Sequence, residues 1–302
     1  MNKLIVIAGP TASGKTAAAI ELAKHYNTVV VSADSRQFYR EMSIGTAKPT
    51  RDELAEVKHY FINSLSITDI FTAGDYEKRC LALLNELFQL HEVVILVGGS
   101  GLFIKAVCEG FDEFPDPVPG LREKLNQELE DNGIGPLQEK LKISDPEYYD
   151  LVDLNNPQRV IRALEVSEST GKPFSSYHKS TINKRPFRII KFGLDLPRAD
   201  LYQRINRRVN TMLQHGLVEE AKSLLPHRRL NALNTVGYTE LFDYFDNKIN
   251  LTDAVELIKQ NTRRYAKRQM TWFGKDDEIL WLQADKPSLV DEMVAKIDAI
   301  TK

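Results

Sequence analysis

Short apolar runs alternate with segments of helical periodicity along the first third of the chain. The runs are KLIVIAG (residues 3–9), TVVVSAD (28–34) and EVVILVGGSG (92–101). Before the third run, a helical period is formed by Cys80, Leu81, Leu84, Leu87 and Phe88. A run that is apolar at successive positions is typical of a parallel strand buried on both faces. The alternation therefore predicts an α/β core with a parallel sheet flanked by helices.

The pattern changes after Gly110. The segment FPDPVPG (114–120) carries three prolines, which indicates a stiff exit from the core. Helical periods without strand character follow, and strand character returns at FRIIKFGLDL (187–196). We therefore predict a core of residues 1–112 and 188–302 and an inserted all-helical domain at 113–187. In the returning core we expect a helix broken near Gly216, an irregular stretch around NTVGYTE, a long helix at about 251–273 and one more strand, EILWLQ.

Composition narrows the class of protein. The chain has 302 residues and a net charge of −2, so a nucleic-acid surface must be a local patch. Its two cysteines, Cys80 and Cys108, form no CxxC pattern, which favours a reducing compartment and disfavours a zinc site. No apolar run has the length of a membrane span or a signal peptide. We expect a cytoplasmic protein with no membrane partner.

The segment GPTASGKT, Gly9–Thr16, matches the pattern G-x-x-x-x-G-K-[ST] between a predicted strand and a predicted helix. Backbone N–H groups of such a loop and the helix N-terminus hold phosphate oxygens. Lys15 supplies a mobile positive charge, and the Thr16 hydroxyl is suited to Mg²⁺. The segment predicts a di- or triphosphate site in a P-loop NTPase-like fold.

A carboxylate, Asp34, ends the strand after this loop and its helix. P-loop ATPases hold Mg²⁺ through an acidic residue on another strand, but the run 92–101 ends in glycines. Two interpretations of Asp34 remain open: a general base that accepts a proton from a nucleophile, or a group that organises Mg²⁺ or caps a helix.

Arginines in LYQRINRRVN supply a second phosphate-directed element. Arg204 and Arg208 are four residues apart, so they share a helix face and can clamp one oxyanion.

Two further helices carry positive stripes. Arg263 and Lys267 belong to KQNTRRYAKRQMTWF, a cationic run that suits a phosphodiester backbone. Arg159 and Arg162 share a face of a predicted insertion helix. A solvated surface explains each stripe equally well, and Arg162 has Glu165 three residues away as an ion-pair partner.

Six motifs, in order, resemble those of the tRNA dimethylallyltransferases, also called tRNA isopentenyltransferases. They are GPTASGKT, SADSRQFYREMSIGTAKP, LVGGSGLFIKAVCEG, NPQRVIRALEV, VGYTE and RRYAKRQMTWF, and they span Gly9 to Phe273. The resemblance implies transfer of a dimethylallyl group from its diphosphate to N6 of the adenosine 3′ to the anticodon. It implies a monomeric, bacterial-type enzyme with Mg²⁺ as cofactor and the tRNA anticodon stem-loop and dimethylallyl diphosphate as partners.

The resemblance also assigns roles to individual residues, and the two positive stripes add further tRNA-binding candidates. The catalytic residues are Asp34 as base, Thr16, which also holds the metal, and Arg208. The expected diphosphate-binding residues are Gly9, Thr11, Ala12, Ser13, Gly14, Lys15, Thr16, Arg204 and Arg208. The expected tRNA-binding residues are Asp34, Ser35, Arg36, Gln37, Ser100, Arg122, Gln158, Arg159, Arg162, Val236, Gly237, Tyr238, Arg263 and Lys267. Ser100 stands where the family usually has Thr, and the hydroxyl is retained.

Three alternatives compete with this hypothesis. A P-loop nucleotide or metabolite kinase shares the loop and an Asp34 base, but it leaves the helical insertion and the late basic helix unexplained. A related isopentenyltransferase that acts on free adenine nucleotides has no need of the basic stripes. A non-catalytic RNA-binding NTPase is the third.

Overall fold

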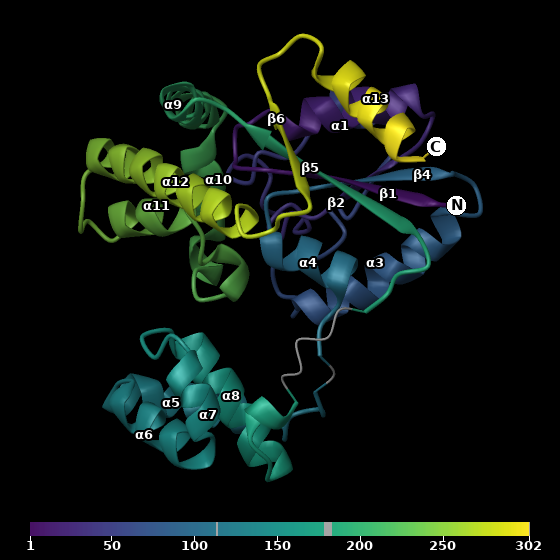
Figure 1. Ribbon diagram of the computed structural model, residues 1–302. Helices are drawn as coiled ribbons and strands as arrows, with labels where there is room; N and C mark the ends of the chain where they lie inside the picture. Colours follow the sequence, from purple (N-terminus) through teal and green to yellow (C-terminus); the bar gives the residue numbers. More distant parts are fainter. Residues whose placement is uncertain (113, 178–182, 302) are drawn as a thin grey trace. The chain divides into compact units, whose positions relative to one another are not determined.

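The computed structural model describes residues 1–112, 114–177 and 183–301 (Figure 1). The chain forms two compact units. Unit 1 consists of Met1–Cys108 and Arg185–Lys302, and unit 2 of Glu109–Lys184. Unit 2 thus begins and ends slightly before the insertion predicted at 113–187.

A six-stranded sheet forms the centre of unit 1. The strands pair in parallel in the order β3-β2-β4-β1-β5-β6. Their bounds are β1 Lys3–Ala8, β2 Val30–Ser32, β3 His59–Tyr60, β4 Val93–Val97, β5 Arg188–Asp195 and β6 Ile279–Gln283. The predicted parallel α/β fold is confirmed, and the two-residue β3 is an addition that the apolar pattern did not predict.

Helices cover both faces of the sheet (Figure 1). On β1, Ile5 and Ile7 share a buried cluster with α1 (Lys15–His25) and α13 (Leu289–Thr301), whereas Leu4 and Val6 share another with α3 (Ala73–Leu87) and α4 (Gly101–Glu109). Alternate residues of a strand face opposite sides, so a strand with helices on both sides is apolar throughout. This is why the first run of the sequence lacks polar positions.

Among the described residues, unit 1 contains five further α-helices besides two short 3-10 helices. They are α2 Arg51–Glu56, α9 Arg198–Gln214, α10 Leu217–Leu224, α11 Tyr238–Phe245 and α12 Leu251–Phe273. The break near Gly216 is confirmed, since Gly216 has φ 95° between α9 and α10. The stretch NTVGYTE is less irregular than expected, because α11 begins inside it at Tyr238. No helix in the described ranges is long and apolar enough to cross a membrane.

The described part of unit 2 is helical. Its main helices are α5 Leu121–Asn132, α6 Gly135–Ser144, α7 Pro146–Leu151 and α8 Pro157–Thr170. They enclose a core of their own, formed by residues such as Leu125, Leu141 and Leu164. The Asn156 side chain caps α8, Pro157 begins it, and Gly171 closes it at φ 67°.

Candidate active site

The carboxyl ends of three adjacent strands converge in unit 1. β1 leads into the loop Gly9–Gly14, β2 into Asp34, and β4 into Gly98–Ser100. Short bonds join these ends: Ala33 N donates to Val97 O at 2.7 Å and Ser100 N to Ala33 O at 3.3 Å. A Cβ on Gly98 would lie 2.2 Å from Ala33 O, so only glycine allows this approach. Ligands of open α/β sheets bind at this edge, and the loop and Asp34 meet here.

The phosphate loop requires unusual backbone angles. Gly9 has φ 145° and Gly14 φ 93°, and Ala12 adopts φ 64°, which an L-residue rarely does. Lys15 Nζ donates to Pro10 O at 2.6 Å. Ser13 is fully buried, and within the described ranges its Oγ has no hydrogen-bond partner. Ser13 therefore has no exposed surface with which it could contact a ligand of the loop.

Cations crowd this loop. Burial, and then the neighbouring Arg208, lower the pKa of Lys15 from 10.5 to about 7, although Asp34 acts in the opposite direction. Burial likewise lowers the pKa of Arg208. The Arg204 guanidinium lies 4.0 Å from where a Cβ of Gly14 would be. Such a cluster favours an anion, because a bound anion restores the protonated form of Lys15.

We predict that anion binding takes up a proton at Lys15. At a pH one unit above its pKa of about 7, free Lys15 is mostly neutral, and a bound pyrophosphate raises that pKa. Wild-type protein should therefore bind inorganic pyrophosphate with uptake of nearly one proton, and its affinity should fall as the pH rises. Calorimetry in buffers of different ionisation enthalpy measures this. Lys15→Met is the control for the titration of pyrophosphate itself, and equal uptake by both proteins would contradict the prediction.

Asp34 is held in place by its own turn. Its Oδ1 accepts from Arg36 N at 2.9 Å. The next residue, Ser35, donates its N–H to Ser100 Oγ at 3.0 Å, and the two hydroxyls lie 3.2 Å apart. The hydroxyl at position 100 therefore orients the turn that carries Asp34.

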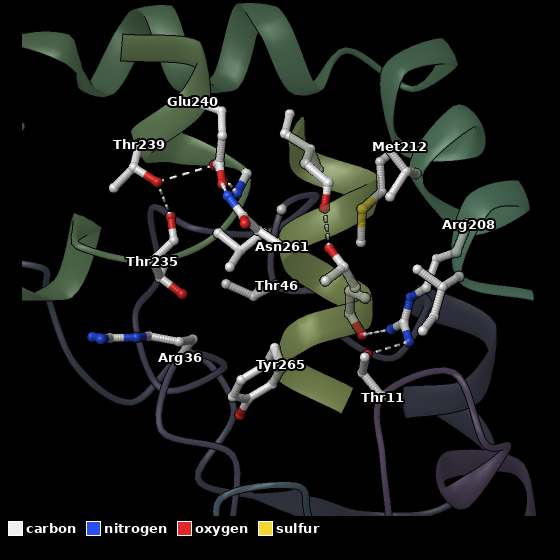
Figure 2. A pocket seen from close by; sticks show the side chains of 18 of the residues that line it. Thr11, Arg36, Thr46, Arg208, Met212, Thr235, Thr239, Glu240, Asn261 and Tyr265 are labelled. Atoms are coloured by element: carbon white, nitrogen blue, oxygen red, sulfur yellow. Dashed lines mark hydrogen bonds between the residues drawn. The ribbon is translucent and has the colours of Figure 1, made fainter. Parts of the chain in front are cut away.

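Two cavities adjoin at Asp34. One, of about 940 Å³, is lined by Lys15, Thr16 and Arg204, and the other, of about 510 Å³, by Ser35 and Arg36 among others (Figure 2). Both cavities are lined by Thr11, Asp34, Thr46, Ala47, Arg208, Met212 and Tyr265. One carboxylate and one guanidinium thus face a phosphate site on one side and a second ligand space on the other.

Arg208 bridges the phosphate loop and a second loop. Its Nη1 donates to Thr11 Oγ1 at 3.3 Å (Figure 2), and its Nη2 to Ala47 O at 3.2 Å. Gln37 Nε2 also donates to Ala47 O, at 3.2 Å. Of the two predicted clamp residues, Arg208 lines both cavities and Arg204 the larger one.

The second loop is fixed from α10. Glu220 accepts from three successive backbone N–H groups, those of Ser43, Ile44 and Gly45, at 2.8–2.9 Å. It also accepts from the Tyr238 hydroxyl at 2.7 Å. This carboxylate thereby helps to position the loop whose Ala47 carbonyl accepts from Arg208.

Tyr238, which we expected to contact tRNA, supports a loop from inside the core. Tyr238 has no exposed surface, because its ring fills the space beside Gly45, where a Cβ would lie 2.7 Å from it. Burial and Glu220 raise the pKa of Tyr238, so it remains a hydrogen-bond donor to the loop. The adjacent Val236 and Gly237, also expected to bind tRNA, do line the smaller cavity.

Side chains from α11 and α12 also line the smaller cavity. Glu240 is buried and accepts from Gly237 N, Thr239 Oγ1 and Asn261 Nδ2 at 2.8, 3.0 and 2.7 Å (Figure 2). Burial, and then Asp34, raise the pKa of Tyr265 to about 12, so its hydroxyl stays protonated beside that carboxylate.

Sequence reasoning missed several of these residues. They are Glu220, Glu240, Asn261, Tyr265 and Gln269. For all of them except Glu220, the available signal was a position within or beside the motifs VGYTE and RRYAKRQMTWF.

Among the other predicted tRNA contacts of unit 1, two arginines are held by hydrogen bonds and one lysine is exposed. Arg36 donates to Asn231 O and Asn234 O at 3.1 and 3.3 Å. Arg263 Nη1 donates to Asn206 Oδ1 at 2.7 Å, and Lys267 is exposed.

In unit 2, two of the predicted tRNA contacts form ion pairs with Glu165, and the other two are exposed. Glu165, whose side chain is 4% exposed, accepts two bonds of 2.8 Å from Arg122 and one of 2.7 Å from Arg162. The ion-pair interpretation of Arg162 is therefore correct, and it extends to Arg122. Both guanidinium groups retain exposed surface, and Gln158 and Arg159 are exposed at the start of α8.

The donor set at the phosphate loop suits Mg²⁺. Thr16 and Asp34 supply oxygen atoms to the larger cavity, and among the described residues no three His, Cys, Asp or Glu side chains form a metal cluster. Mg²⁺ commonly takes one or two protein ligands and completes its shell with substrate phosphates and water. These residues therefore fit a metal that arrives with a diphosphate.

Comparison with known proteins agrees with this site. A family model described as IPP transferase matches residues 37–276. A tRNA dimethylallyltransferase from Christiangramia forsetii is 52% identical over 98% of this chain and 99% of its own length, and one from Cytophaga hutchinsonii is 49% identical over 99% and 98%.

Solved structures agree as well. The tRNA isopentenylpyrophosphate transferase of Bacillus halodurans has a TM-score of 0.74 at 35% identity, with 99% of this chain and 96% of that one covered. A eukaryotic dimethylallyltransferase described as acting on tRNA gives a TM-score of 0.79 at 27% identity, with 99% and 78% covered.

Proposed function

The chain belongs to the IPP transferase family, and we propose that it transfers a dimethylallyl group from dimethylallyl diphosphate to N6 of an adenosine in tRNA, releasing diphosphate. The observation that carries the proposal is the place of Asp34 and Arg208 between a phosphate-loop cavity and a second cavity. The relatives' names supply the two substrates. We assign the adenosine 3′ to the anticodon as the target, as the motif resemblance implies.

The proposed chemistry uses the two sides of Asp34. The adenosine leaves its stack and places N6 in the smaller cavity, at a cost of a few kcal/mol. N6 attacks the allylic carbon, the carbon–oxygen bond breaks, and its electron pair leaves with the diphosphate. Asp34 accepts the proton from N6. Lys15 and Arg208 stabilise the charge that develops on the diphosphate.

Thr16 would hold Mg²⁺ at the diphosphate, with Asp34 near enough to the same cavity to orient its water. When bound, the ion neutralises phosphate charge and so favours departure of the diphosphate.

Each unit would contribute exposed cations that contact the tRNA. Arg159 at the start of α8 and Lys267 on α12 are exposed, and backbone cations with single-strand readout suit an anticodon loop. As the motif resemblance implies, we propose that a monomer acts, in the cytoplasm with its tRNA.

The α12 stripe yields a prediction. Replacing Arg263 and Lys267 by alanine should weaken tRNA binding, lower the log–log salt slope by roughly 0.7–0.9 per lost phosphate contact, and leave pyrophosphate affinity unchanged. Filter binding over a salt series measures this. The control replaces Lys78 and Arg79, exposed cations on α3. An unchanged slope would mean that the stripe is merely solvated.

One assay tests the function directly. Purified protein is incubated with radiolabelled dimethylallyl diphosphate and unmodified tRNA, and the label in tRNA is measured. A parallel reaction replaces tRNA by adenosine monophosphate. A separate binding measurement compares the affinities for ATP and pyrophosphate. Label in the free nucleotide alone would favour the nucleotide transferase, tight ATP binding with phosphoryl transfer would favour a kinase, and tRNA binding without transfer would favour a non-catalytic protein.

A further inference from the structure

One buried amide links three segments that are remote in sequence. Gln269 lies on α12 and is 6% exposed. Its Oε1 accepts from Thr11 N at 2.9 Å, and its Nε2 donates to Gly99 O at 2.8 Å. A Cβ on Gly99 would lie 2.3 Å from that Nε2, so glycine at 99 makes the second bond possible. The side chain thus ties the phosphate loop to the end of β4 and to α12.

The bond to Thr11 lies next to the strained residue of the phosphate loop. The next residue, Ala12, has φ 64°, a conformation that costs an L-residue roughly 1–2 kcal/mol. Strained backbone of this kind persists when its surroundings fix it. Gln269 fixes the Thr11 N–H, and therefore the start of the strained turn.

The same bond reaches Arg208 through the Thr11 side chain. Thr11 Oγ1 accepts from Arg208 Nη1 at 3.3 Å, and Arg208 Nη2 donates to Ala47 O at 3.2 Å. A displacement of Thr11 would therefore move one of the two oxygens that orient this guanidinium. Gln269 itself lines the larger cavity with Lys15 and Arg204.

The two bonds require one acceptor and one donor in a fixed order. An amide supplies both, whereas an ionised carboxylate has acceptors alone and an ammonium has donors alone. A protonated carboxylic acid again supplies one of each. Gln269 is thus chemically specified at this position, and its replacement by glutamate makes the bonding depend on pH.

We propose that Gln269 is a positioning residue for the diphosphate subsite: it holds Thr11, and through Thr11 the clamp Arg208, in the arrangement that binds the diphosphate. The identity of the ligand rests on the proposed function, but the bonds to Thr11 and Gly99 do not.

The test compares Gln269→Met, which keeps the length of the side chain and removes both bonds, with Gln260→Met, the same change at an exposed position of the same helix. Inorganic pyrophosphate with Mg²⁺ is the probe. Two lost hydrogen bonds should weaken its binding roughly tenfold in Gln269→Met, with no change in Gln260→Met. The affinity for tRNA should stay within about twofold of wild type, since tRNA is held by cations elsewhere.

Gln269→Glu supplies a signature that a packing role would not produce. At neutral pH its carboxylate lacks the donor for Gly99 O, so pyrophosphate binding should be weakened. Burial beside a carbonyl raises the pKa of such a carboxyl above its ordinary value of about 4.3. As the pH falls through that raised pKa, the ratio of variant to wild-type affinity should recover toward one. This series also carries the test if Gln269→Met fails to fold.

Three results would overturn the proposal. They are wild-type pyrophosphate affinity in folded Gln269→Met, equal losses of pyrophosphate and tRNA affinity in that variant, and a Gln269→Glu ratio that does not change with pH. Failure of the proposed function looks different: wild-type protein would bind pyrophosphate in the same Gln269-dependent way and yet leave tRNA unmodified.

Discussion

Replacing Asp34 by asparagine is expected to slow transfer to tRNA by roughly 10²–10⁴-fold, the usual contribution of a positioned general base. The structure supports a clean experiment. Asp34 Oδ1 accepts from Arg36 N at 2.9 Å, and an asparagine oxygen can accept the same bond. The turn should therefore persist while the proton acceptor is lost, and pyrophosphate affinity should change little.

A Mg²⁺ titration separates the two open interpretations of Asp34. If the carboxylate mainly organises the metal, pyrophosphate affinity should fall together with the rate, and added Mg²⁺ should restore part of both. If it is the base, pyrophosphate affinity stays near that of the wild type and added Mg²⁺ does not restore the rate. Asp285→Asn, at an exposed position after β6, controls for the loss of one negative charge. A normal single-turnover rate in Asp34→Asn would refute both roles.

The centre of this site was predictable because it is encoded locally. A phosphate loop is a contiguous motif between a strand and a helix, and Asp34 ends the next apolar run. Parallel strands bring their carboxyl ends to one edge of the sheet, so consecutive segments of sequence predict neighbours in space. The ends of α8 were predictable for the same reason, since Asn156, Pro157 and Gly171 act on adjacent backbone.

The supports of the site were not predictable in this way. Gln269 bonds Thr11 from 258 residues away, and Glu220 bonds Ser43 from 177 residues away. The hydrophobic periodicity of the chain does not predict such long-range bonds. The burial of Tyr238 was not predictable either, because a motif tyrosine near a site can equally bind a ligand or support a loop, and its burial follows from the packing of Gly45 against its ring.

Removing the insertion should separate the two proposed substrates. We expect a protein in which a short Gly-Ser linker replaces residues 109–184 to bind pyrophosphate as the wild type does. The ends of the remaining core already lie together, because Arg185 donates to Val107 O and to Ala106 O, each at 2.8 Å, and to Glu77 Oε1 at 2.7 Å. Each unit also has its own buried core, so the sheet and the phosphate loop should fold without unit 2.

Transfer to tRNA by the same protein should fall by at least roughly 100-fold, which corresponds to about 3 kcal/mol of lost interaction, because unit 2 presents Arg159 and the partly exposed Arg122 and Arg162. The assay measures label in tRNA, while a cooperative unfolding transition and pyrophosphate affinity report on the core.

A variant of the intact chain tests one exposed end of α8. Replacing Gln158 and Arg159 by alanine should weaken tRNA binding without altering pyrophosphate binding.

Full modification of tRNA by the linker protein would contradict the proposed role of unit 2. It would leave recognition to α12 and to the smaller cavity, which is the proposed site of the adenosine.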